Sequence, residues 1–230
     1  MSSNENKSSV SLIVTIAVAV LAVAAIVILL VSMNASGEPS EPEGPVIPGF
    51  EVTQELADEC IAAAQKLVGD NYEIIKLFVT EGLPLKKVYG NEPEAMNGYY
   101  QIDSSKYTEI SQIENVVKSV YSNGEANRIL TELEANTKDG TQKKLEIYRQ
   151  CKIDGVEFLG LNEEFAVEAD YKTDWSSCYV EVDPHSETEC EITVYLDGVT
   201  SETAAEHSNS VRKTAMVKTG SDWRLTEFLK

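Results

Sequence analysis

Cysteine is the residue type in this sequence whose chemistry is easiest to anticipate. The chain has four cysteines, Cys60, Cys151, Cys178 and Cys190, and all of them follow residue 51. In a domain outside the cytoplasm an even number of cysteines permits two disulfides, with three possible pairings. Each cysteine also falls on an apolar face of its expected element, where a free thiol packs as a small hydrophobe. Disulfides and buried free thiols both remain open at this point.

Cys178 and Cys190 flank a predicted hairpin turn at residues 183–186. Side chains alternate along a strand, so burying the apolar rows of both strands places the two sulfurs on one side of the sheet. We expect Val182 to pair with Ser186 across the turn, and this pairing fixes the register of the two strands. Cys178 then lies directly opposite Cys190, with Cα atoms about 4.5 Å apart. We predict a Cys178–Cys190 disulfide, which a register shift of two residues would abolish.

Other side chains give little support to catalysis. The two histidines, His185 and His207, occur in polar, turn-like sequence, which is typical of solvated loop residues. A nucleophilic site needs a base oriented by a third group, and no local string supplies one. Zinc-binding and phosphate-binding motifs do not occur in the sequence. Glu163 and Glu164 could transfer protons only inside a pocket, so we predict no catalytic residues, no metal site and no cofactor.

Aromatic residues offer a second kind of site, a recognition surface. Tyr171, Trp175 and Tyr179 cluster just before or within a predicted strand. Tyr179 and Tyr195 share the outward face of the predicted hairpin. Outward Tyr and Trp bring a large contact area at low entropic cost, which suits binding. We favour the alternative interpretation, in which these residues stabilise the sheet as cross-strand pairs.

The net charge of −19 narrows the class of partner. Glu5 and Lys7 cancel, so all of this charge falls on residues 33–230. Because nucleic acids and anionic lipids are bound by Lys and Arg, which displace counterions, we expect no nucleic-acid partner. Acidity serves solubility in general. Its functional interpretation here is an acidic face that meets a basic protein of the cell envelope.

The segment 10–32 contains no charged residue. A helix of twenty such residues covers about 30 Å, the hydrocarbon thickness of a bilayer. It is longer than the core of a signal peptide, and Met33 stands where cleavage requires a small residue, so we predict an uncleaved transmembrane helix. Lys7 and the acids after the helix predict a cytoplasmic tail at 1–9 and a C-terminal part outside the cell membrane. Prolines, glycines and acids predict an extended linker at 33–50.

Helical periodicity predicts four helices in the first half of an outer domain spanning residues 51–230. We expect a break between the first two at Gly69-Asp70, where Asp70 or Asn71 would cap the second helix. The third covers 109–121. Ser122 and Glu125 have the spacing of a capping box and predict the start of the fourth.

A period of two predicts strands throughout the second half of the domain. One hairpin turns at 152–155, a second pairs 177–182 with 190–196, and a third closes the domain around Gly220. Helices followed by antiparallel strands indicate an α+β fold, with the helices packed on one face of a curved antiparallel sheet.

The order of these elements and several short strings resemble a known group of proteins. The strings are Tyr99-Tyr100-Gln-Ile102, Ile153-Asp154-Gly155 and Gly220-Ser-Asp-Trp223-Arg-Leu. They are similar to extracytoplasmic domains of Gram-positive bacteria that form a cystatin-like, nuclear-transport-factor-like cone. The nearest family is that of the IseA-type inhibitors of cell-wall DL-endopeptidases, which residues 51–230 resemble as a pattern of elements. Proteins of this fold include enzymes, binding modules and accessory domains.

We therefore predict a single-pass membrane protein whose outer domain is a non-catalytic binding or regulatory module of the bacterial cell envelope. One alternative is an inhibitor of a cell-wall DL-endopeptidase, in which the acidic domain occupies a basic cleft. The other is a small-molecule enzyme or ligand binder with a cone-shaped pocket. A deep pocket with an inward Asp or Glu would favour this last alternative, whereas a filled cone with an acidic convex face would favour an interaction module.

Overall fold

The computed structural model describes residues 50–87 and 93–230. These residues belong to one compact unit. The predicted cytoplasmic tail, transmembrane helix and linker, up to residue 49, lie outside the described residues. Within the described ranges, no helix is long and apolar enough to cross a membrane.

The first helix of the domain is longer than predicted. Helix α2 spans Gln54–Ile75 without interruption and continues into a short π-helix, η1, at Lys76–Thr80. The predicted break at Gly69-Asp70 is therefore wrong. Glycine in a helix interior costs only about 1 kcal/mol relative to alanine, and buried apolar residues on both sides of Gly69 outweigh that cost.

Helices α3 (Ile110–Val120) and α4 (Asn123–Glu132) confirm the predicted third and fourth helices. The predicted capping box of α4 is wrong, because the Ser122 side chain makes no capping hydrogen bond. The Glu125 carboxylate instead accepts from the N–H of Phe228 at 2.7 Å. A long-range contact has replaced the local one that the spacing predicted.

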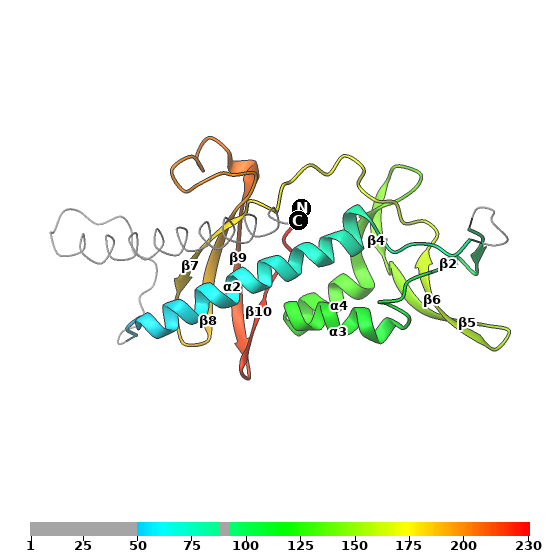
Figure 1. Cartoon of the computed structure of the whole chain (residues 1–230), viewed down its shortest axis with the longest axis horizontal. Helices are drawn as coiled ribbons and strands as arrows, with labels where there is room; N and C mark the ends of the chain where they lie inside the picture. Colours follow the sequence, from blue (N-terminus) through cyan, green and yellow to red (C-terminus); the bar gives the residue numbers. More distant parts are fainter. Residues whose placement is uncertain (1–49, 88–92) are drawn as a thin grey trace, which may run out of the picture. The chain divides into compact units, whose positions relative to one another are not determined.

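The described strands form three antiparallel sheets (Figure 1). The N-terminal sheet has the order β1-β2-β6-β5, with bounds Ala95–Met96, Tyr99–Gln101, Val156–Asn162 and Tyr148–Ile153. The C-terminal sheet has the order β10-β9-β8-β7, with bounds Asp222–Leu225, Val211–Thr219, Glu189–Tyr195 and Tyr179–Pro184. The strands β3 (Leu133–Asn136) and β4 (Gln142–Leu145) form a two-stranded ribbon. The α+β class is confirmed, whereas the prediction of one curved sheet is wrong.

Two of the predicted hairpins are confirmed with their turns. The β5–β6 hairpin turns at Asp154 and Gly155, whose φ angles are 51° and 83°. Positive φ at both central residues is what a tight hairpin turn requires, and Asp-Gly supplies it at little cost. The β9–β10 hairpin turns at Gly220, which has a φ of 66°.

Helix α2 and its continuation η1 serve both four-stranded sheets. Helix α2 packs on β7, β8 and β10 of the C-terminal sheet. The η1 segment packs on the N-terminal sheet, where the Tyr148 hydroxyl donates to the Leu77 carbonyl at 2.6 Å. The Tyr148 ring also meets Phe78 edge-on, with centroids 5.2 Å apart. One continuous helical element thus joins the two sheets.

Asn71, expected as a helix cap, is instead a fully buried link between α2 and the end of the chain. Its Nδ2 donates to the Leu229 carbonyl at 2.9 Å, and its Oδ1 accepts from the Leu229 N–H at 3.3 Å. The same oxygen accepts from the Tyr121 hydroxyl at the end of α3. Every polar atom of the amide is therefore used in a place that water does not reach.

Candidate functional site

The hairpin that carries Cys190 is present, but its register differs from the predicted one. Pro184 lies opposite Cys190, and β7 begins only at Tyr179. Cys178 therefore precedes the strand and does not face Cys190. All four cysteines are free thiols in the structure. The predicted Cys178–Cys190 disulfide is wrong because its register is wrong.

A later turn explains this register. The sequence predicts the reversal at 183–186, because Asp and Pro favour turns. In the structure the N–H groups of His185 and Ser186 both donate to the Glu189 carbonyl, at 3.0 and 3.1 Å. Pro184 is thereby left at the end of β7, the edge strand of the C-terminal sheet. An edge strand tolerates proline because one of its sides has no hydrogen-bonded neighbour.

The residues weighed for acid–base chemistry lie at the surface. His185 and His207 are exposed, as predicted, and His185 Nε2 is 3.4 Å from Asp183 Oδ2. Glu163 and Glu164 are exposed in the turn after β6, so they do not face one another in a pocket. Over the described ranges, no three His, Cys, Asp or Glu side chains gather to hold a metal ion.

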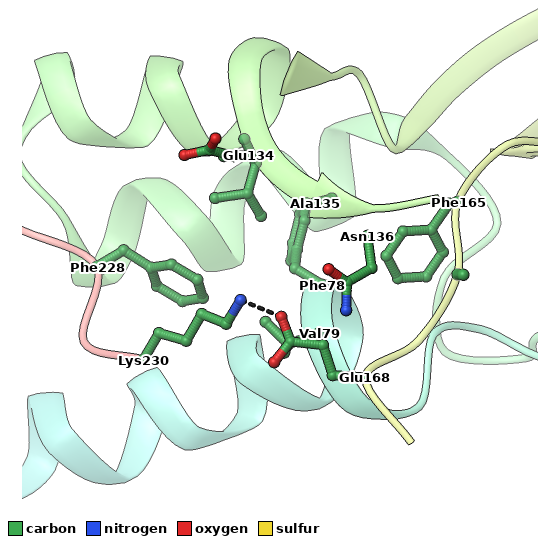
Figure 2. Close-up of a pocket in the computed structure, with 11 residues that line it drawn as sticks. Phe78, Val79, Glu134, Ala135, Asn136, Phe165, Glu168, Phe228 and Lys230 are labelled. Atoms are coloured by element: carbon green, nitrogen blue, oxygen red, sulfur yellow. Dashed lines mark hydrogen bonds and ion pairs between the residues drawn. The ribbon is translucent and has the colours of Figure 1, made fainter. Parts of the chain in front are cut away.

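A recess lies between η1, β3, the segment after β6 and the end of the chain (Figure 2). Its walls are largely apolar, and its lining includes Phe78, Val79, Leu133, Ala135, Phe165 and Phe228. Glu168 and Lys230 form an ion pair within it. Its volume of about 10 Å³ is no more than one water molecule requires. This recess has no room for a substrate.

An open, acidic hollow lies at the start of α2. Its lining includes Glu51, Glu55, Glu59 and Glu187, and it encloses about 540 Å³. Glu59 accepts from Lys218 Nζ at 2.5 Å and from the indole N–H of Trp223 at 2.8 Å. These hydrogen bonds, first that from Lys218 and then that from Trp223, lower the pKa of Glu59. The hollow is a charged surface feature, and its one basic lining residue, Lys218, is already paired.

A tyrosine–glutamate cluster, formed by Tyr179, Glu181 and Tyr195, lies on the face of the C-terminal sheet opposite the buried apolar row. Tyr179 and Tyr195 oppose each other in the register, and their rings stack with centroids 5.4 Å apart. The Tyr179 hydroxyl donates to one carboxylate oxygen of Glu181 at 2.9 Å, and the Tyr195 hydroxyl donates to the other at 2.7 Å. The cluster thus holds one carboxylate in a fixed position.

The environment keeps both tyrosines of the cluster protonated. Burial, and then the hydrogen bond to Glu181, raises the pKa of Tyr179 and that of Tyr195 to about 12. Tyr195 is only 6% exposed and supports the carboxylate from the sheet, whereas Tyr179 and Glu181 are half-buried and reachable from solvent. The cluster therefore places a carboxylate beside an aromatic ring on the outer face of the sheet.

The outward position of Tyr179 and Tyr195 is confirmed, and so is their cross-strand pairing. For Tyr171 and Trp175 that interpretation is wrong, because both precede β7 and lie in no strand, where the Trp175 indole N–H donates to the Tyr171 hydroxyl at 2.8 Å. Glu181 is the member of the cluster that sequence reasoning did not single out. The sequence does indicate the position of Glu181, because it follows Tyr179 by two residues and therefore lies on the same face of the strand. Three more acids, Asp183, Glu189 and Glu191, lie on the same face by the same alternation.

Comparison with known proteins assigns no family to the chain. No family model matches it, and no curated protein matches it. Function must therefore be inferred from the residues and their geometry.

Proposed function

We propose that this chain is a membrane-anchored module that binds a basic protein of the cell envelope through the outer face of its C-terminal sheet, and that it is not an enzyme. The tyrosine–glutamate cluster carries the proposal. A carboxylate has about four lone-pair positions, and the two tyrosines occupy two of them, so Glu181 can still accept from a partner. An Arg or Lys side chain placed there gains charge pairing with Glu181 and ring contact with Tyr179.

The surrounding charge supports a basic partner. Asp183 and Glu189 extend the acidic face around the cluster, whereas Glu191 on the same face is paired with Lys213 of β9 at 3.9 Å. The whole chain carries a net charge of −19. Complementary charge raises the rate of encounter and suppresses partners of the wrong sign. The predicted transmembrane helix at 10–32 would hold this face close to the outer surface of the membrane.

The basic substrate cleft of a cell-wall DL-endopeptidase is the narrower candidate partner. It rests on the resemblance of residues 51–230 to IseA-type inhibitors, together with the acidic face described above. The recess of Figure 2 gives no support to a small-molecule enzyme, because about 10 Å³ admits no substrate.

Binding can be tested with the full chain in nanodiscs of zwitterionic lipid, using an oligoarginine peptide and a purified DL-endopeptidase as separate probes. We expect binding of the peptide to weaken as salt rises, because exposed charges are screened beyond about 8 Å at physiological ionic strength. Glu181→Gln should weaken binding about tenfold, the loss of roughly one charge-assisted contact. Inhibition of the DL-endopeptidase with the same salt dependence would establish the narrower candidate.

Glu157→Gln is the matched control, since it removes the same charge from the exposed part of β6 on the N-terminal sheet. Equal losses from Glu157→Gln and Glu181→Gln would reduce the effect to general charge attraction and contradict the proposed face. Failure of both probes to bind at low salt would refute a basic partner altogether.

The membrane topology has its own test. Protease added to intact cells or protoplasts should digest residues 51–230 and leave a membrane-bound stub of about 5 kDa, the mass of the anchor and linker. Recovery of the whole domain in the culture medium would instead show that the N-terminal helix is a cleaved signal peptide.

A further inference from the structure

Two of the cysteines, Cys60 and Cys190, lie close together in the core although about 130 residues separate them in the sequence. Cys60 lies on α2 and is 0% exposed, and Cys190 lies near the start of β8 and is 1% exposed. Helix α2 packs on β8. Lys218 joins the two regions, because its Nζ donates to the Glu59 carboxylate beside Cys60 and its N–H donates to the Thr188 carbonyl, two residues before Cys190. The two thiols lie close enough for each to affect the pKa of the other. The Cys190 thiol also lies 3.3 Å from the Glu191 carbonyl.

The other two cysteines have different surroundings. Cys151 lies on the N-terminal sheet, where its sulfur packs beside Gly160. Cys178 precedes β7 and is partly exposed. A disulfide requires side chains that point towards each other from a short distance. Among the four cysteines, Cys60 and Cys190 are the two that the packing of α2 on β8 brings close together.

We propose that Cys60 and Cys190 are joined by a disulfide in the mature protein. The oxidant is a disulfide-bearing oxidoreductase or a small-molecule disulfide. In the exchange, both S–H bonds of the pair break and one S–S bond forms between them. The S–S bond of the oxidant breaks in turn, and its two sulfurs leave as thiols, so that two protons and two electrons pass to the oxidant. This inference rests on the proposed position of residues 51–230 outside the cytoplasm, where disulfides persist.

Burial determines when such a bond can form. It raises the pKa of Cys60, and it raises the pKa of Cys190 to about 12. Because the thiolate is the attacking species in exchange, the folded and reduced protein should react slowly. The bond must therefore form during folding, before α2 packs on β8 and excludes solvent and oxidant from both thiols.

The separation of Cys60 and Cys190 along the chain means that the disulfide should stabilise the fold strongly. It would connect the first helix of the domain to a strand about 130 residues later. A long closed loop restricts the unfolded chain more than a short one does. It would also hold α2 against the sheet that carries the tyrosine–glutamate cluster.

The full chain, purified in detergent, can be unfolded, reduced and refolded in mixed reduced and oxidised glutathione. After free thiols are alkylated, chymotrypsin cleaves after Tyr179 and separates Cys178 from Cys190. We expect mass spectrometry to find one peptide pair that links Cys60 to Cys190 and that separates on reduction. The oxidised protein should melt roughly 5–10 °C above the reduced protein. The folded, reduced protein should form the link much more slowly with the same oxidant.

Variants and cell samples complete the test. Cys178→Ser should keep both the linked peptide and the higher melting temperature, whereas Cys60→Ser should lose both. Alkylation of Cys60 and Cys190 after oxidative refolding, or a link from Cys190 to Cys178, would overturn the pairing whether or not the variants fold. A link that forms in vitro but is absent from protein alkylated in cells would overturn the disulfide of the mature protein. A failure to bind oligoarginine, by contrast, would contradict the proposed function and would leave the disulfide proposal unaffected.

Discussion

The outer face of the N-terminal sheet is closed over a glycine, whereas the outer face of the C-terminal sheet presents a carboxylate beside a tyrosine. On the N-terminal sheet, Tyr99 is 7% exposed and packs over Gly160, with its ring centroid 4.9 Å from the Arg149 guanidinium. Phe158, 6% exposed, opposes Cys151 in the same layer. The large side chains of Tyr99 and Phe158 cover this face and exclude water from it.

The C-terminal sheet uses aromatic residues differently. Tyr179 and Tyr195 also stack, but their hydroxyls hold Glu181 where a partner can reach it. Two sheets that pack on one helical element therefore differ in what their outer faces do. Substitutions on the N-terminal face should change stability alone, whereas substitutions at the tyrosine–glutamate cluster should also change binding. The following predictions test this division, starting with the helix that the sheets share.

Asn71→Ala should have the largest effect, because it leaves the Tyr121 hydroxyl and the Leu229 backbone groups without their buried partner. We expect a loss of about 2–4 kcal/mol in the free energy of unfolding, measured with denaturant. Hydrogen exchange should accelerate in both sheets, since both pack on the same helical element. The exposed Asn127→Ala should stay within about 0.5 kcal/mol of the wild type. Acceleration confined to one sheet would show that α2 and η1 do not couple them.

Gly160→Ala should cost about 1–3 kcal/mol in the free energy of unfolding. An added Cβ would lie 2.9 Å from both the Cys151 sulfur and the Tyr99 Cβ, and the Tyr99 Cβ cannot move without its strand. Gly69→Ala is the matched control, because a Cβ there meets nothing within 4 Å. It should stabilise α2 by up to about 1 kcal/mol. A Gly160→Ala variant that is not destabilised would contradict the closed face, and a destabilised Gly69→Ala variant would contradict the continuous helix.

The tyrosine–glutamate cluster predicts a loss of stability at alkaline pH. Tyr179 and Tyr195 have pKa values of about 12 in the folded protein. Between about pH 10 and pH 12 the unfolded chain therefore loses protons that the folded chain keeps, and stability falls as pH rises. Glu181→Gln should make these tyrosines ionise at lower pH, in an ultraviolet titration against the wild type. An unchanged titration curve would show that the carboxylate does not act on either hydroxyl.

Glu59 predicts the smallest effect, on the acid side. Its folded pKa lies below its ordinary value of 4.5, so its contribution is complete above that pH and is lost as pH falls through the folded pKa. Because the Glu59 side chain is 44% exposed, Glu59→Gln should cost no more than about 1 kcal/mol at pH 7. Lys218→Gln should reduce the same acid dependence, measured in unfolding curves followed by tryptophan fluorescence, while the hydrogen bond from Trp223 retains part of it. A dependence that survives both changes must come from other carboxylates.

Local patterns in the sequence were sufficient for much of the fold and for part of the site. Asp154-Gly155 specified its turn through φ angles that few residue types adopt. The period of 3.6 residues located α3, and the period of two put Tyr179 and Tyr195 on one outward face. Each of these features depends on neighbours a few residues apart, which is the range over which a sequence pattern acts directly.

Contacts between distant residues decided the rest. Gly69 stays helical because the helix around it is buried against elements from the end of the chain, and Asn71 lies in the core because Leu229 and Tyr121 occupy its hydrogen bonds. The register of β7 and β8 follows from their turn and neighbours, which moved Cys178 away from Cys190. The approach of Cys60 to Cys190 appears in no local pattern, because about 130 residues separate them and only the packing of α2 on β8 brings them together.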